Sequence, residues 1–126
     1  MTKDTMMDTQ QQGKKYDKGK LRMDLLPPAM LKGVAEVLEM GAQKYGDYNW
    51  YNGIVFSRLY AATLRHLVAW WEGEETDPES GIDHVHHAMC NLAFLAQFIH
   101  EERDELDDRK FGVIEFGGDD DKQDLS

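Results

Sequence analysis

Residues Ala69–Asn91 read AWWEGEETDPESGIDHVHHAMCN and carry the most informative pattern of the sequence. This stretch joins the end of one apolar helical segment to the start of another through a turn rich in glycine and acidic residues. Six carboxylates there lie close to three histidines: Glu72, Glu74, Glu75, Asp77, Glu79 and Asp83 beside His84, His86 and His87. This pattern indicates a divalent-metal or polar active site at a helix–helix junction. The alternative is a solvated acidic turn followed by a helix whose histidines are structural.

The bulk composition predicts one intracellular domain that binds a small ligand. A chain of 126 residues is large enough for a single core. Its single cysteine, Cys90, allows no internal disulfide, which suits a reducing cytoplasm. The polar N-terminus offers no apolar region typical of a signal peptide, and no apolar run approaches the roughly 20 residues of a membrane span. The net charge of −10 argues against a long nucleic acid as partner.

Hydrophobic periodicity predicts an all-α domain over residues 16–110, a small bundle of three main helices behind an extended N-terminal arm. The first helix is expected from Pro28 to Gly46, and the second from a cap at Ser57 to Trp71. The third starts at Asp77 or at Asp83 and continues into the charged run that follows Glu101. Residues 1–15 and 111–126 are predicted to be a disordered arm and a mostly disordered acidic tail. The predicted core stripe of the second helix is Tyr60, Leu64, Leu67, Val68 and Trp71.

The third helix carries a polar face that becomes apolar along its length. His84, His87 and Asn91 recur at helical spacing, and Phe94 and Phe98 continue the same face. This arrangement is typical of a cleft over a core. His86 points elsewhere and is predicted to be exposed to solvent.

Cationic and aromatic residues supply candidate ligand contacts. Arg58 and Arg65 lie two turns apart near small alanines, which suits phosphate oxygens, although both could instead pair with the acidic turn. His66 faces the same junction. In the loop after the first helix, Trp50 could stack on a base that Asn49 reads, or the loop could cover the end of the bundle or form a dimer interface. The basic segment with Lys20 either caps a phosphate site or is a docking arm whose leucines pin it to the body.

Four segments together resemble one phage-encoded family, named for the N-terminal domain of dATP/dGTP diphosphohydrolase. They are DKGKLRMDLLPP, GAQKYGDYNW, SRLYAATLRHLVAWWEGE and DPESGIDHVHHAMCNLAFL, and they cover residues 16 to about 98. The family is discussed alongside MazG-like all-α nucleotide pyrophosphohydrolases. The resemblance implies hydrolysis of a purine deoxynucleoside triphosphate to its monophosphate and pyrophosphate, in a host cytoplasm. MazG-like enzymes hold Mg²⁺ with E-x-x-E and E-x-x-D, which Glu36-x-x-Glu39 and Glu74-x-x-Asp77 match.

The resulting hypothesis is a homo-oligomeric, metal-dependent hydrolase. Glu74, Asp77, His84 and His87 are expected to hold one or two divalent cations, Mg²⁺ or Mn²⁺, with Glu74 and Asp77 as the catalytic carboxylates. The residues expected to contact the nucleotide are Lys20, Lys44, Asn49, Trp50, Arg58, Arg65, His66 and Asn91. The competing hypotheses are a protein that binds or sequesters a nucleotide without hydrolysing it, and a helical interaction module.

Overall fold

The computed structural model describes residues 12–110, in which three long helices account for most of the ordered chain. They are α1 (Pro28–Tyr45), α2 (Phe56–Trp71) and α3 (His84–His100), accompanied by the short 3₁₀ helices η2 (Met23–Leu25), η3 (Asn49–Asn52) and η4 (Asp104–Leu106). Between residues 12 and 110 there is no β-strand, so the all-α prediction is confirmed. Most of the predicted N-terminal arm, and the whole tail 111–126, lie outside the described residues.

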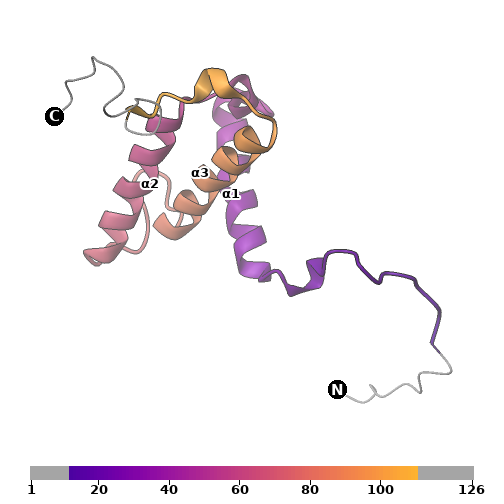
Figure 1. The fold of residues 1–126 in the computed structure, drawn as a ribbon. Helices are drawn as coiled ribbons and strands as arrows, with labels where there is room; N and C mark the ends of the chain where they lie inside the picture. Colours follow the sequence, from indigo (N-terminus) through magenta and orange to yellow (C-terminus); the bar gives the residue numbers. More distant parts are fainter. Residues whose placement is uncertain (1–11, 111–126) are drawn as a thin grey trace.

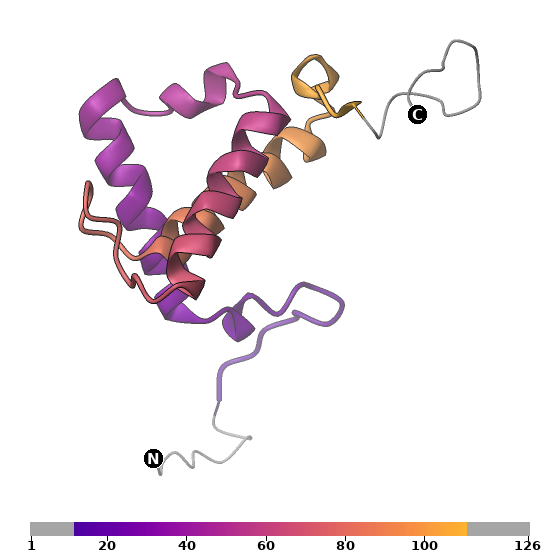
Figure 2. The same ribbon diagram turned by 90° about the vertical axis from the view of Figure 1, so that its left-hand side faces the viewer.

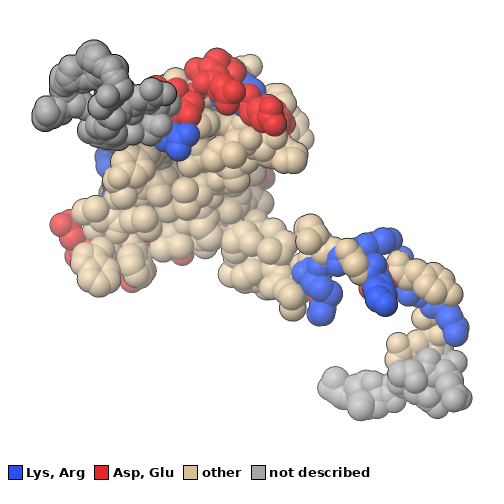
Figure 3. Space-filling model, viewed as in Figure 1, with Lys and Arg blue, Asp and Glu red and all other residues tan. Residues whose placement is uncertain are grey.

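Helix α3 is the central element, because it packs against both α1 and α2 (Figures 1 and 2). The segment before α1 extends away from this helical body, and Lys and Arg gather along it (Figure 3). Leu21, Met23 and Leu25 in this segment are exposed. The extended arm is therefore confirmed, whereas the expectation that its leucines pin it to the body is wrong.

The hydrophobic core lies at the end of the bundle where α2 begins and α3 ends. Phe56, Leu59, Phe98 and Leu106 are buried there, and Trp50, Ile54, Val55, Phe94 and Leu95 pack around them. The Trp50 ring stacks on Phe94, with centroids 4.7 Å apart and planes 20° apart. The aromatic loop thus covers the end of the bundle, which was one of the alternatives predicted for it.

Polar contacts fasten this loop to the chain that follows α3. The Tyr51 hydroxyl donates a 2.6 Å hydrogen bond to Glu101, and the Arg103 guanidinium donates to the carbonyl of Tyr51 at 3.2 Å. Helix α2 begins at Phe56, two residues earlier than a cap at Ser57 predicts, and Ser57 does not cap it. Instead, the Ser57 backbone N–H donates to Asp108 at 2.8 Å, so that a distant carboxylate satisfies a free amide of the helix start.

Helix α3 stops at His100, so the predicted extension into the charged run is wrong. Glu102 adopts a left-handed backbone with φ of 55°, which breaks the helical path. The reversal lets the following turn, η4, return to the bundle and bury Leu106 in the core. Burial of one leucine at this site therefore overrides the helical preference of the charged residues around it.

The predicted core stripe of α2 is wrong. Tyr60, Leu64, Leu67, Val68 and Trp71 are all exposed, and the buried residues of the helix are Phe56, Leu59 and Thr63. The reason is geometric: among the long helices α2 packs mainly against α3, so a single face of α2 is covered. The periodicity of the sequence correctly indicates a helix but does not say which of its two apolar faces meets α3.

His86 contradicts its predicted exposure, because it packs into α1 over Gly33. A Cβ atom added at Gly33 would lie 2.4 Å from the His86 ring. We expect Gly33→Ala to lower the free energy of unfolding by about 1–3 kcal/mol, because the clash outweighs the higher helix propensity of alanine. Urea unfolding followed by circular dichroism measures this change. Gly41→Ala in the same helix meets no atom within 4 Å and should be neutral or stabilising.

Candidate functional site

The candidate site occupies the end of the bundle opposite the aromatic core, where the α2–α3 turn meets the first turn of α3. His84 and His87 are buried there, and His66 approaches them from α2. Backbone hydrogen bonds shape the turn: the N–H of His84 donates to the carbonyl of Glu75 at 3.0 Å, and that of Asp77 donates to Ile82 at 2.9 Å. The turn therefore holds its acidic residues against the histidines.

The centre of the site is a chain of three side chains, Glu74, His84 and His66. Glu74 Oε1 lies 2.7 Å from Nε2 of His84, and Nδ1 of His84 lies 2.8 Å from Nδ1 of His66. Both ring nitrogens of His84 are thus used. We call this chain the Glu74–His84–His66 relay.

Hydrogen bonding assigns the protons along the relay. An ionised Glu74 accepts from Nε2–H of His84, so in a neutral ring Nδ1 of His84 must be the acceptor. His66 then donates through Nδ1–H, which leaves the lone pair of its Nε2 available. This nitrogen has no hydrogen-bond partner among residues 12–110, nor does it occur among their buried unsatisfied atoms. A carboxylate that orients an imidazole, with a free nitrogen at the far end, is the arrangement of a general base.

His66 also contacts the second buried histidine. Its ring stacks on that of His87, with centroids 4.5 Å apart and planes 5° apart. Burial lowers the pKa of His66, and the neighbouring His87 and His84 lower it further. Burial likewise lowers the pKa of His87, although Asp77 opposes this effect. Both rings are therefore kept neutral at pH 7, the state in which a histidine accepts a proton.

Asp77 and Ser80 form the second polar group of the site. Ser80 Oγ lies 2.7 Å from Nε2 of His87 and 3.1 Å from Asp77 Oδ2, while Asp77 Oδ2 is 3.7 Å from the same Nε2. Burial opposes ionisation of Asp77, but hydrogen bonds from Ser80 and from the backbone N–H of Glu79 hold its pKa below the ordinary value. Because serine and aspartate meet the same nitrogen of His87, this trio lacks the geometry of a Ser-His-Asp nucleophile, in which the two contact different nitrogens.

The four predicted metal ligands come together in two pairs, Glu74 with His84 and Asp77 with His87, and His66 lies between the pairs. Within residues 12–110, no three His, Cys, Asp or Glu side chains are arranged to hold a metal ion. A cation at the first pair would have to displace the bond between Glu74 and His84. The side chains as they stand thus form a hydrogen-bonded site rather than a preformed metal centre.

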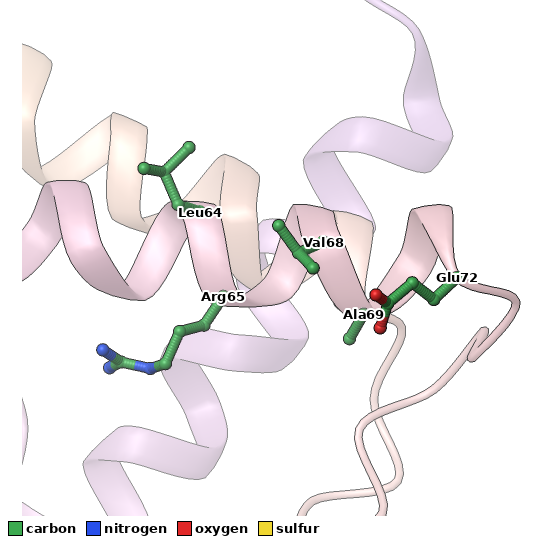
Figure 4. Close-up of a pocket in the computed structure, with 5 residues that line it drawn as sticks. All are labelled: Leu64, Arg65, Val68, Ala69 and Glu72. Carbon is green, nitrogen blue, oxygen red and sulfur yellow. The ribbon is translucent and has the colours of Figure 1, made fainter.

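The residues predicted to contact a nucleotide are dispersed. His66 lies in the site, whereas Lys20, Lys44, Asn49 and Arg58 are exposed elsewhere. Arg65 is exposed beside a shallow groove of α2 (Figure 4), yet its charge still lowers the pKa of His66. Asn91 is half-buried one turn beyond His87, and Trp50 is packed in the distant core. The structure brings together the histidines and acids and leaves the other predicted contacts separate.

The sequence patterns do not predict two features of the site. The first is Ser80, which lies three residues after Asp77 in a turn, where a serine can bond back to an aspartate. His66 was expected to contact substrate, but not to receive the end of a relay. Its position seven residues after Leu59, a residue of the buried face, was the available signal.

The chain is similar in sequence to known proteins. The family described as "dATP/dGTP diphosphohydrolase, N-terminal" matches residues 10–109. A protein of Salmonella phage PMBT28 named "dATP/dGTP diphosphohydrolase" is 36% identical over 101 residues, which cover 80% of this chain and 34% of the relative. The chain thus corresponds to about a third of the length of that protein. No solved structure matches the chain. No helix within residues 12–110 is both long and apolar enough to cross a membrane.

Proposed function

The chain belongs to the dATP/dGTP diphosphohydrolase N-terminal family, and from this premise we propose that it hydrolyses purine deoxynucleoside triphosphates at the Glu74–His84–His66 relay. The observation that carries the proposal is the free Nε2 of His66 at the end of a chain that a carboxylate anchors. The lowered pKa of His66 supports this role, because side chains with shifted pKa values cluster at functional sites. The name of the phage relative supplies the substrate class.

The proposed reaction converts a triphosphate and water into a monophosphate and pyrophosphate. Nε2 of His66 accepts a proton from water as the water oxygen bonds to the α-phosphorus. The bond between the α-phosphorus and the bridging oxygen breaks, and pyrophosphate leaves with the electron pair. Glu74 stabilises the positive charge that spreads from His66 to His84 as the proton arrives. Arg65, which immediately precedes His66 in the sequence, is proposed to contact the phosphates of the nucleotide.

The experiment is incubation of the purified protein with each of the four deoxynucleoside triphosphates in the presence of Mg²⁺ or Mn²⁺, with the products resolved by chromatography. We expect dAMP or dGMP together with pyrophosphate. Glu74→Gln, which keeps the shape of the side chain but cannot stabilise a charged relay, should abolish most of the turnover. Glu79→Gln, in the same turn but exposed, is the matched control. Intact triphosphates under every condition would refute hydrolysis by this chain.

Dependence on a divalent cation remains a prediction. Because Mg²⁺ commonly binds through substrate phosphates with one or two carboxylates, we expect it to enter with the nucleotide. EDTA should therefore stop turnover, and added Mg²⁺ should restore it. Calorimetry of the protein without nucleotide should show no tight binding of either Mg²⁺ or Mn²⁺. Tight binding that Asp77→Asn removes would instead indicate the four-ligand centre predicted from the sequence.

A second candidate is nucleotide binding without hydrolysis. It is favoured by the length comparison, since a chain that spans about a third of its relative can correspond to a recognition module of a longer enzyme. Equilibrium dialysis against dATP and dGTP separates the two proposals. A binding module retains the nucleotide intact, and its affinity does not depend on the protonation of His66.

A further inference from the structure

One face of α2 is apolar and open. The α2 stripe, defined as Tyr60, Leu64, Leu67, Val68 and Trp71, is 39–80% exposed along its length. A groove of about 380 Å³ runs along its edge, lined by Leu64, Arg65, Val68, Ala69 and Glu72 (Figure 4). Within residues 12–110, α2 meets α3 through the other face of the helix. A contiguous apolar stripe on a polar chain marks an interaction surface.

The spacing of the α2 stripe indicates a helix as its partner. Tyr60, Leu64, Leu67 and Trp71 are separated by four, three and four residues. Alternating steps of three and four keep an apolar seam facing one neighbouring helix, as in coiled coils. A strand or a flat surface would not require this periodicity.

The charges around the stripe indicate how the two helices are oriented. Arg58 and Arg65 flank its first half, whereas Glu72, Glu74 and Glu75 follow its end. In an antiparallel pair of identical helices, Tyr60 would face Trp71 of the second copy, and Leu64 would face its Leu67. Arg58 would then approach the acidic end of the other α2, where the helix dipole is also negative, whereas the two Arg65 side chains would lie near the two-fold axis and remain in solvent. A parallel pair would place arginine on arginine and acid on acid.

We propose that the α2 stripe binds a second copy of this chain, with the two α2 helices antiparallel about a two-fold axis. The stripe is self-complementary in the spacing of its apolar residues and in the opposite charges at its two ends, and a two-fold interface requires self-complementarity. The relay is on a different face of α2, because His66 is turned toward α3 while the stripe is turned outward. Association through the stripe therefore does not involve the His66 ring, and the test of the interface is separate from the test of hydrolysis.

The first test is the molar mass of the full-length chain by light scattering. We expect twice the monomer mass for the parent protein and the monomer mass for Leu64→Glu. The control is Ile99→Glu, since Ile99 is an exposed apolar residue of α3 outside the stripe. It should remain dimeric. Circular dichroism verifies that each variant keeps its helices. A monomeric parent, or a dimeric Leu64→Glu, would overturn the proposal.

The second test determines the orientation with two variants that each add one cysteine, Tyr60→Cys and Trp71→Cys. A disulfide needs Cα atoms within about 7 Å. In the antiparallel pair, residue 60 faces residue 71, while the two copies of residue 60 are eleven residues apart along the helix axis, about 16 Å. Oxidation should therefore cross-link the mixture of the two variants but neither variant alone. Native Cys90 does not interfere, because burial raises the pKa of its thiol to about 11.

The exposed apolar residues of the N-terminal arm offer a different occupant for the stripe. If the arm of a second copy covered it, Leu21→Glu would dissociate the dimer as completely as Leu64→Glu does, and the mixed cysteine variants would not cross-link. That pair of results would overturn helix pairing in favour of arm exchange. Cross-linking of Tyr60→Cys with itself would instead indicate a parallel pair and would overturn the orientation.

Discussion

The variant His66→Asn should lower kcat for dATP or dGTP hydrolysis by about 10²–10⁴-fold, the usual contribution of a general base. The asparagine amide occupies the place of Nδ1 and still donates to Nδ1 of His84, so the relay geometry survives. It has no counterpart of Nε2, and the proton acceptor is lost. Steady-state kinetics on the parent and the variant measure this change.

The pH profile provides an independent readout of the same group. Protonated His66 cannot accept a proton, so kcat/KM should be at its plateau above the pKa of His66 and fall as the pH drops through it. Because burial, His87 and His84 lower that pKa, the fall should occur below the ordinary histidine value of about 6.5. The acidic fall should vanish in any residual activity of His66→Asn.

Two controls separate a role in catalysis from one in folding. His100→Asn changes an exposed histidine at the other end of α3 and should leave kcat and the pH profile unchanged. Thermal unfolding of His66→Asn should stay close to that of the parent, because the contact with His84 is kept. Full activity in a folded His66→Asn variant would refute His66 as the base.

Phe98→Ala should cause the largest loss of stability, about 3–5 kcal/mol in the free energy of unfolding. Phe98 is fully buried, and its ring lies 5.8 Å from that of Trp50 and beneath the Arg103 guanidinium, 5.2 Å from the centroid. Removing it opens a cavity at the point where α2, α3, the aromatic loop and η4 meet. Urea unfolding followed by circular dichroism gives the value.

The neighbouring position supplies the control for this cavity. Ile99 is exposed on the same helix, so Ile99→Ala should cost less than about 1 kcal/mol. If both variants lost the same stability, the core would not be centred on Phe98. Because the folded chain is proposed to dimerise, the two variants are compared with the parent at one protein concentration.

Much of the fold follows from local features of the sequence. Helix α1 begins at Pro28 and ends at Tyr45, just before Gly46, where φ is 100°, because proline suits a helix start and glycine tolerates the conformation that ends it. The face that passes from His84 and His87 to Phe98 was also predictable, since helical periodicity alone puts these residues in line. The grouping of acids and histidines at the α2–α3 turn is also predictable, because these residues are close in sequence.

The contacts between elements were decided by the tertiary structure. Helix α2 has two apolar faces, and packing against α3 chose the one with Phe56 and Leu59 and left the α2 stripe open. His66 meets His84 across two helices, 18 residues apart, so no local pattern could pair them. Sequence periodicity determines which residues share a face of one helix, whereas the burial of apolar surface between helices determines which faces meet. The Glu74–His84–His66 relay depends on this meeting of helix faces, because His66 and His84 lie on different helices.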